Sequence, residues 1–317
     1  MMRAWLFGLL ALGTLAPQAR ATTGIGWRWG DNVERRYLLQ AQVRLPEMIP
    51  VKSLTNTDLR VVEYYLAVVT RCTSSVASKK TWELLCTFED VQFDAAPPRA
   101  DANRGLKELL DEWDQLLLGT TAQIVFSRDG LIRNVSLEGV NTRIRRFREI
   151  EETLRLLLLR DLAGLELQTP KSGDDRGRPW QQKDSLAVDL PKSMGSFGSV
   201  RLLHTVGEER EGSVVVIDTT GEALVSSGET VGAPGGERMR NVFDMEVRGR
   251  SRFDLEAGTL VSRDYIVTGE PTASSALATG VAGTLYVQAV HVELIPREAE
   301  VTPLGENHET VPGENGI

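Results

Sequence analysis

The chain contains two cysteines, Cys72 and Cys86, and the residues around each of them alternate between apolar and polar side chains. Such alternation is typical of a β-strand with one buried face, and both cysteines fall on the apolar set of their own segment. If the chain turns about Lys79, the two cysteines stand directly opposite each other in an antiparallel pair. Opposed residues in such a pair lie about 4.5 to 5.5 Å apart at Cα, within or near the range that a disulfide accepts. The pattern predicts a hairpin closed by a core-facing Cys72–Cys86 disulfide.

Two other uses of a cysteine pair are weaker alternatives. A zinc site needs further ligands, but the three histidines cluster neither with the cysteines nor with each other. A redox-active pair more typically has two intervening residues at the start of a helix, whereas thirteen separate this pair. We therefore expect a structural disulfide and no bound metal or cofactor. The three histidines are His204, His291 and His308.

The first 21 residues have the features of a secretory signal peptide. Met1-Met2-Arg3 supplies a positive start, residues 4–16 are apolar, and Ala19-Arg20-Ala21 fits a cleavage site. A membrane anchor is the alternative, but the apolar run is too short to span a bilayer. No cysteine at the cleavage site offers a point for lipid attachment. We expect a mature chain that begins near Thr22, lies in the periplasm or outside the cell, and has no stable membrane insertion.

The charge of the chain narrows the range of partners. The net charge is −8, and loss of Arg3 and Arg20 with the signal peptide makes it −10. An acidic protein has no general electrostatic attraction to nucleic acids or to anionic membranes. The basic group Arg143 to Arg146 is an exception that can indicate a membrane-binding helix. Acidic residues that can pair with arginines of this segment lie four positions further along the chain, as Glu149 does after Arg145. We therefore prefer to interpret the segment as the solvated face of a helix.

Two segments show the apolar spacing of amphipathic helices. The first, 101–118, ends at Gly119, and the second, 141–164, begins at an Asn141 cap and ends at Gly164. We expect both apolar stripes to pack on a sheet. The stripes consist of Leu106, Leu109, Leu110, Trp113, Leu116 and Leu117 in the first segment, and Ile144, Phe147, Ile150, Leu154, Leu157 and Leu158 in the second.

Most of the remaining chain alternates as strands do, with turns at Arg128-Asp129-Gly130 and Glu256-Ala257-Gly258. The sequence therefore predicts an α+β fold: a large antiparallel sheet of about a dozen strands, as a half-barrel or as two packed β lobes, with two amphipathic helices. The predicted strands are 37–45, 61–68, 82–88, 122–126, 131–137, 186–190, 200–206, 214–217, 242–254, 260–268 and 284–295.

A polar segment rich in Pro and Gly, residues 169–179, divides the chain in two. Residues 22–168 form the predicted α+β half, and residues 180–296 the predicted all-β half. Small residues dominate 269–283, which we interpret as a surface loop in preference to a mobile flap. The acidic tail, 297–317, is poor in apolar residues and is expected to be disordered.

Signatures of catalysis are absent from the sequence. It contains no Gly-x-Ser-x-Gly elbow, no His-Glu-x-x-His helix and no phosphate-binding loop. A Ser-His-Asp triad would have to use His204 or His291, and each lies within a predicted strand. We therefore expect a protein that is not an enzyme, with a secreted hydrolase as a distant alternative.

The order of these elements resembles the periplasmic lipoprotein-carrier fold (LolA/LolB-like): a signal peptide, long antiparallel strands, and two apolar-faced helices after the early strands. The hairpin FDLEAGTLVSRDY is similar to hairpins of uncharacterised bacterial secreted proteins. In the carrier fold an open half-barrel holds helices against its concave face and binds acyl chains between them. The chain departs from that fold in its greater length, its midchain linker and its acidic tail.

Two functional hypotheses follow. The first is a binding or carrier protein for a lipid or other apolar ligand, held between the helix stripes and a curved sheet. Ordinary core packing is the alternative explanation of the same stripes. The second hypothesis is an envelope interaction or scaffold module that uses exposed strand edges or the tail to meet a partner protein. The candidate cavity residues are Trp113, Leu116, Leu117, Leu154, Leu157 and Leu158.

Overall fold

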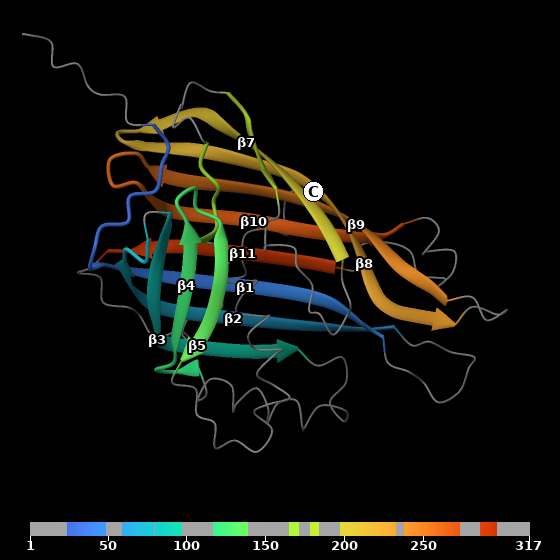
Figure 1. Ribbon diagram of the computed structural model, residues 1–317. Coiled ribbons are helices and arrows are strands. Elements are labelled where there is room, and N and C mark those ends of the chain that lie inside the picture. The colour runs from blue at the N-terminus through green and yellow to red at the C-terminus, as the bar shows by residue number, and fades with distance from the viewer. Residues whose placement is uncertain are drawn as a thin grey trace, which may run out of the picture.

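A computed structural model describes residues 24–48, 59–78, 80–96, 117–138, 165–170, 178–183, 197–232, 238–272 and 286–296. These residues form one open antiparallel sheet of eleven strands, in the order β5-β4-β3-β2-β1-β11-β10-β9-β8-β7-β6 (Figure 1). The strands are β1 (Val33–Met48), β2 (Leu59–Ser75), β3 (Thr81–Ala96), β4 (Thr121–Ser127), β5 (Ile132–Glu138), β6 (Trp180–Lys183), β7 (Phe197–Glu211), β8 (Val214–Gly232), β9 (Arg238–Asp254), β10 (Thr259–Pro271) and β11 (Tyr286–Ile295).

The first and last strands pair with each other in the middle of the sheet. Tyr37 of β1 lies opposite Leu294 of β11, and the same register continues to Arg44 opposite Val287. From β1 the chain meanders to one edge at β5, and from the opposite edge at β6 it meanders back to β11. The strands of both predicted halves therefore share one sheet, so the half-barrel alternative describes them better than two separate lobes.

Burial alternates along the strands as the sequence pattern predicts. In β9, Met245 and Val247 are buried while Asp244, Glu246 and Arg248 are exposed. We call the face that carries the buried set of β8 to β11 the inner face, and the opposite face the outer face. Because successive strand residues point to opposite faces, the exposed charges of β9 belong to the outer face.

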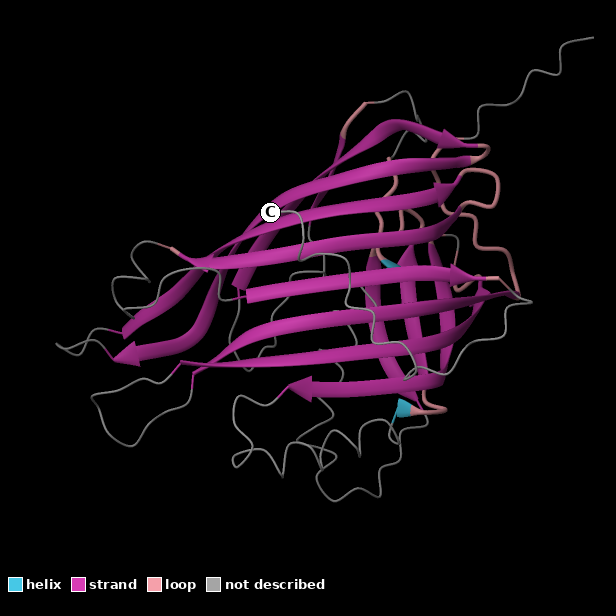
Figure 2. Ribbon diagram, turned by 180° about the vertical axis from the view of Figure 1, so that it is seen from behind, coloured by secondary structure: helices cyan, strands magenta, loops and turns pink. Residues whose placement is uncertain are grey.

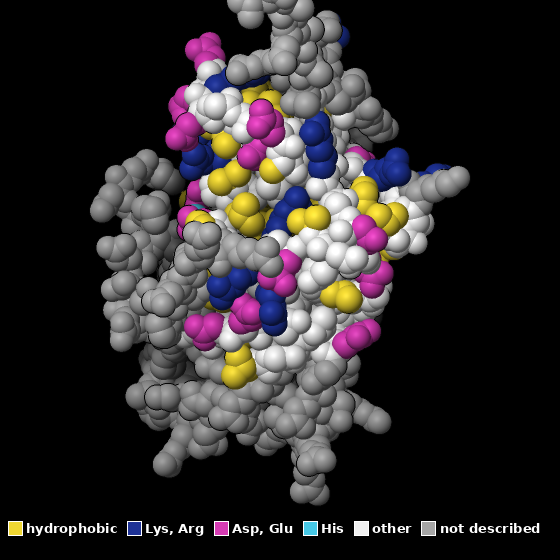
Figure 3. All heavy atoms as spheres, turned by 90° about the vertical axis from the view of Figure 1, so that its left-hand side faces the viewer, with side chains coloured by type: hydrophobic (Ala, Val, Ile, Leu, Met, Phe, Trp, Pro, Cys, Tyr) yellow, Lys and Arg dark blue, Asp and Glu magenta, His cyan; other side chains and the backbone are white. Residues whose placement is uncertain are grey.

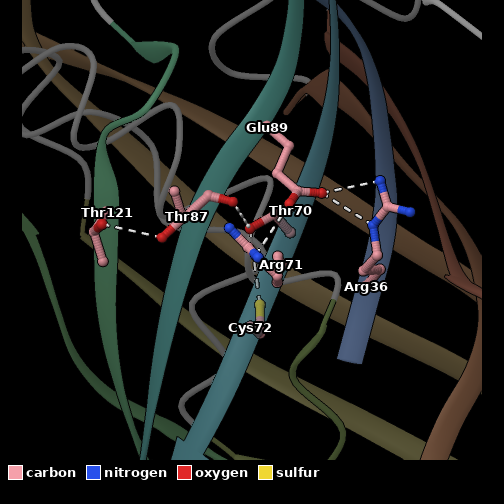
Figure 4. A network of polar contacts seen from close by, with 7 residues as sticks. All are labelled: Arg36, Thr70, Arg71, Cys72, Thr87, Glu89 and Thr121. Atoms are coloured by element: carbon pink, nitrogen blue, oxygen red, sulfur yellow. Dashed lines mark hydrogen bonds and ion pairs between the residues drawn. The ribbon is translucent and has the colours of Figure 1, made fainter. Parts of the chain in front are cut away.

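The predicted disulfide is confirmed. Cys72 lies opposite Cys86 in the β2–β3 register, the Cα atoms are 3.9 Å apart, and both side chains are buried in the core. The hydroxyl of Thr70 lies 3.8 Å from the Cys72 sulfur and donates to the Thr87 carbonyl at 3.2 Å (Figure 4). A disulfide of this kind is typical of proteins outside the cytoplasm.

A β-bulge near the disulfide positions an ion-pair bridge. Val69 pairs with Asp90 but Thr70 pairs with Phe88, which leaves Glu89 as the extra residue. Arg36 and Arg71 lie directly opposite each other, and like charges so placed are unfavourable. Glu89 accepts from both guanidinium groups at 3.0 Å and offsets their repulsion (Figure 4).

The sheet curls at one end, so that β4 and β5 cross steeply in front of the long strands (Figures 1 and 2). The space inside the curl is filled by the segment that precedes β1. Trp27 and Trp29 stack at a centroid distance of 4.8 Å. Trp29 contacts Phe126 of β4, and Trp27 meets Phe253 of β9 edge-to-face. This aromatic cluster joins the two arms of the sheet and seals that end of the inner face.

Several sequence predictions fall outside the described residues: the signal peptide, strand 186–190, the tail and the body of both helices. Leu117, at the end of the first predicted helix, is described and is 1% exposed. Several strands are longer than expected, as β8 is, which continues to Gly232 instead of ending at Ile217. The loop predicted at 269–283 begins later because β10 continues to Pro271, and the short edge strand β6 was not predicted.

Candidate functional site

The inner face is a broad apolar surface built by neighbouring strands. One cross-strand row runs through Leu66, Ala41, Val290 and Tyr265, which are register partners on β2, β1, β11 and β10. All four side chains are 3% exposed or less. Further buried apolar residues on this face are Leu39, Val68, Met245, Val247, Val267 and Val292.

A group of polar side chains interrupts this apolar surface on the β6–β10 side. Each side chain is 1% exposed or less, which is unusual for residues of these types. Burial of polar groups is costly without hydrogen-bond partners, so such a group marks either a structural network or a binding site. We call it the polar cluster, and it consists of Gln182, His204, Thr219, Ser251 and Arg263.

Residues 165–170, which we call the strap, contact the polar cluster and three other parts of the fold. Gln168 N donates to Gln182 Oε1 at 3.1 Å, and Trp180 Nε1 of β6 donates to the Gln168 carbonyl at 2.7 Å. Thr169 N donates to the carbonyl of Asp129, in the β4–β5 turn, at 2.7 Å. The strap therefore ties the β5 side of the sheet to the β6 side.

The strap is also held from the N-terminal side and from β10. Trp27 Nε1 donates to the Leu167 carbonyl at 2.8 Å, and Arg263 Nη1 donates to the Glu166 carbonyl. Leu165, Glu166 and Leu167 are all 1% exposed or less. The strap thus brings a buried acid, Glu166, close to the buried base Arg263.

Hydrogen bonds define the tautomer of His204. Gln182 Oε1 already accepts the Gln168 N–H, so the contact of 2.9 Å between this oxygen and His204 Nε2 requires a proton on Nε2. His204 Nδ1 then accepts from the Thr219 hydroxyl at 2.9 Å. Burial, with a smaller contribution from the charge of Arg263, lowers the pKa of His204 to about 3. The imidazole is therefore neutral at physiological pH.

Arg263 is a fully buried base on β10. Burial lowers its pKa, and the nearby Tyr265 and Glu166 groups act in the opposite direction. Its guanidinium carbon lies 5.0 Å from the centre of the Tyr265 ring. Because arginine keeps its charge at neutral pH even when its pKa falls, this site holds a positive charge beside an apolar surface.

Some polar atoms of this region lack partners within the described part of the chain. Ser251 Oγ, Gln182 Nε2 and Gln168 Oε1 are buried without a hydrogen bond there. Gln182 Nε2 is a donor, whereas Gln168 Oε1 is an acceptor. A buried water or a polar ligand atom can satisfy a buried group of this kind.

Most of the predicted cavity residues are not tested. Trp113, Leu116, Leu154, Leu157 and Leu158 lie outside the described residues. Leu117 belongs to the buried hydrophobic core. The predicted lining of an apolar cavity therefore stays a prediction.

The two strand histidines proposed for a hydrolase lie in different surroundings. His204 is buried and hydrogen-bonded to the Thr219 hydroxyl and to Gln182 Oε1. His291 lies on the outer face, with Nδ1 2.6 Å from Asp264 and Nε2 3.7 Å from Glu293. The described contacts join neither histidine to a serine.

Sequence reasoning missed the polar cluster and the strap. Arg263 and Ser251 occupy inner-facing positions of strands whose alternation was recognised. Extending that alternation along each strand would have identified both as polar residues that point to the inner face. The strap had no such signal, since Leu165-Glu166-Leu167 is too short for a periodicity and precedes a polar linker.

The outer face offers a depression of about 940 Å³ above β7 to β10, but its lining is acidic. Glu222 lies opposite Glu246, and Asp244 opposite Glu270. At the end of the molecule that carries the β7–β8 and β9–β10 turns, acidic and basic side chains are interspersed (Figure 3). The charged side chains around this depression do not suit an apolar ligand, so the inner face is the better candidate for the ligand site.

Comparison with known proteins identifies no family. No protein-family profile and no curated protein matches the chain. A solved structure concerned with lipid–protein interactions in lipovitellin is similar at a TM-score of 0.47 and 10% identity, over 87% of this chain and 27% of that one. This chain thus spans little more than a quarter of the length of that protein. Within the described residues there is no helix long and apolar enough to cross a membrane, and no group of three or more metal-ligating side chains.

Proposed function

We propose that this protein is a non-enzymatic binding protein for a lipid or other apolar ligand, and that it acts outside the cytoplasm. The ligand lies on the inner face, between the sheet and the two predicted apolar helices. The observation that carries the proposal is the breadth of the inner face, where Val247, Val267 and Val290 from three strands line one apolar surface. A large apolar surface with a few polar groups at one end is typical of sites for lipids.

The disulfide and the N-terminal sequence support the location. Cys72 and Cys86 are paired in the core, and such pairs persist in oxidising compartments. Residues 1–21 have the composition of a signal peptide. Both features agree with a role in the periplasm or outside the cell.

A scaffold that recruits partners by strand addition is less well supported. Among the described strands, β5 and β6 form the edges of the sheet. β6 has four residues, and β5 carries exposed Arg133 and Glu138. Short edges and charged edges both oppose the addition of another strand.

Binding of a neutral long-chain probe tests the proposal. The purified protein, stripped of lipid on a hydrophobic resin, is titrated with 1-hexadecanol in competition with the neutral fluorophore N-phenyl-1-naphthylamine. We expect saturable binding with one or two sites, and we expect lipid in native mass spectra of protein taken from its own source. Absence of saturable binding, together with lipid-free native protein, would refute the function.

A pair of neighbouring substitutions on β10 supplies the control. Val267 is fully buried on the inner face, whereas Ile266 is partly exposed on the outer face. A one-residue step along a strand changes the face, so Val267→Asp should abolish hexadecanol binding while Ile266→Asp retains it. Circular dichroism of both variants distinguishes loss of the site from loss of the fold. Equal binding by the two folded variants would place the ligand elsewhere.

A further inference from the structure

We propose that the polar cluster is the head-group end of the ligand site, and that Arg263 binds the carboxylate of a long-chain anionic amphiphile there. In this arrangement Glu166 of the strap is a stand-in for the ligand carboxylate, and the two compete for Arg263. The inference rests on the proposed function, because it presupposes that the hydrocarbon part lies on the inner face.

The position of Arg263 on β10 fits a head-group site. Arg263, Tyr265 and Val267 are successive inner-facing residues, so one strand leads from the base to the apolar surface. The guanidinium lies over the Tyr265 ring, with its carbon 5.0 Å from the ring centre. The aromatic cluster of Trp27 and Trp29 seals the inner face near the hairpin turns. A ligand with its head at Arg263 therefore extends its chain away from the sealed end.

The charge balance of the polar cluster favours an anion. His204 is neutral, so Arg263 is the single charged base among the fully buried side chains that the structure describes. A buried guanidinium requires an anionic or strongly accepting partner, and its planar fork matches a carboxylate. Arg263 Nη1 donates to the backbone carbonyl of Glu166, so the strap already lies within reach of this base.

The strap has the chemical pattern of the ligand that we propose. Leu165 and Leu167 flank Glu166 in the sequence, and all three residues are buried. The nearby charge of Glu166 acts to raise the pKa of Arg263. When a ligand carboxylate replaces that of Glu166, Arg263 keeps a counter-ion and the Glu166 side chain turns out of the interior. It has to leave, because a carboxylate left buried without its partner would cost as much as a broken ion pair.

The strap can release Glu166 without losing its other attachments. Gln168 and Thr169 hold the strap to Gln182 and Asp129, through hydrogen bonds that do not involve Glu166. Gln182 Nε2 and Ser251 Oγ are buried donors without partners in the described part of the chain, and both belong to the polar cluster. They offer further hydrogen bonds to a bound head group or to a water beside it.

Comparison of palmitate with 1-hexadecanol tests the inference, because the two probes share a hydrocarbon chain and differ in the head. Both are titrated at pH 8 into the lipid-stripped protein, by displacement of N-phenyl-1-naphthylamine. A charge-assisted hydrogen bond contributes about 1.5 to 3 kcal/mol, so palmitate should bind at least about tenfold more tightly than hexadecanol. Arg263→Gln should remove this preference, so that palmitate and hexadecanol bind the variant with similar affinities. Arg248→Gln, on the outer face, should change neither affinity.

Glu166→Gln gives a second test that does not depend on the stability of the Arg263 variant. It removes the competing carboxylate, so palmitate should bind several-fold more tightly and gain affinity relative to hexadecanol. If both probes bind the original protein equally, or if Glu166→Gln leaves the palmitate affinity unchanged, the head-group inference is wrong and the proposed function stands. If neither probe binds, the proposed function fails as well.

Discussion

His204 and His291 lie on strands of one sheet, and their surroundings shift the imidazole pKa in opposite directions. Burial lowers the pKa of His204 to about 3, so the folded protein holds it neutral. A hydrogen bond to Asp264 raises the pKa of His291 above its usual value, in spite of partial burial. With only three histidines in the chain, the two effects can be separated by substitution.

His204 should make the protein sensitive to mild acid. In the unfolded chain, the imidazole of His204 is protonated below its pKa of about 6.5. In the folded protein it stays neutral until the pH falls to about 3. Its contribution to stability is therefore complete above pH 6.5 and is lost as the pH falls. Between pH 6.5 and pH 5 the loss should reach about 2 kcal/mol. Urea unfolding of the original protein and of His204→Gln at several pH values in this range measures the difference.

The matched control is His291→Gln. Because its folded pKa is raised, His291 stabilises the protein fully below pH 6.5, and this contribution is lost as the pH rises through the folded pKa. The two variants should therefore deviate from the original protein at opposite ends of the pH range. Parallel stability curves for His204→Gln and the original protein would contradict the neutral, buried state of His204.

At the scale of elements, the β4–β5 turn connects the strap to the aromatic cluster. Gly130 has φ of 87°, and a Cβ atom there would collide with the Trp27 indole and the Leu167 carbonyl. Gly119 has a similar φ of 77° with no atom within 4 Å of such a Cβ. The two glycines share a backbone conformation and differ in the space around them.

Gly130→Ala should therefore destabilise the protein much more than Gly119→Ala. The control variant carries only the strain of a left-handed alanine, about 1 to 2 kcal/mol. Gly130→Ala adds the displacement of Trp27 or of the strap, which we expect to raise the loss to roughly 4 kcal/mol. Urea unfolding followed by tryptophan fluorescence reports both values. Equal losses in the two variants would show that the strap and Trp27 are not packed against this turn.

Local pairing explains which elements could be predicted from the sequence. The β2–β3 hairpin and its disulfide depend on an alternation and a turn within about twenty residues, and the register found for Cys72 and Cys86 matches the expected one. The turn at Gly258 and the strands on either side of it are of the same kind. In each case the information lies in one short stretch of chain, where the period of two is visible.

The strap, β6 and the aromatic cluster could not be predicted in this way. Each consists of only a few residues, too few to establish a periodic pattern, and each depends on contacts with residues far away in the sequence. Trp27 meets Leu167 and Phe253, and Arg263 meets Glu166. The candidate site shares this limit, because an isolated Arg on an alternating strand gives no sign of the segment that covers it.

At the scale of the whole molecule, the first and last strands join the two halves of the open sheet. β1 pairs with β2 on one side and with β11 on the other, so the middle of the sheet joins the beginning of the described chain to its end. All other strand pairs of the sheet join strands that follow each other in the sequence. The N-terminal and C-terminal groups of strands can therefore each form by local steps, and the β1–β11 pair unites them.

This topology predicts that the β1–β11 pair forms last during folding. Closing a longer loop costs more entropy, whereas a hairpin such as β2–β3 closes a short one that its disulfide already restrains. Pulse-labelled hydrogen exchange during refolding, with the disulfide intact, should show protection of amides in β2, β3, β9 and β10 several-fold earlier than in the β1–β11 pair. Val292→Ala, which removes a fully buried side chain from β11, should then speed unfolding and leave early protection unchanged. Protection of β11 in the earliest phase would instead show that the two terminal strands meet first and organise the sheet around them.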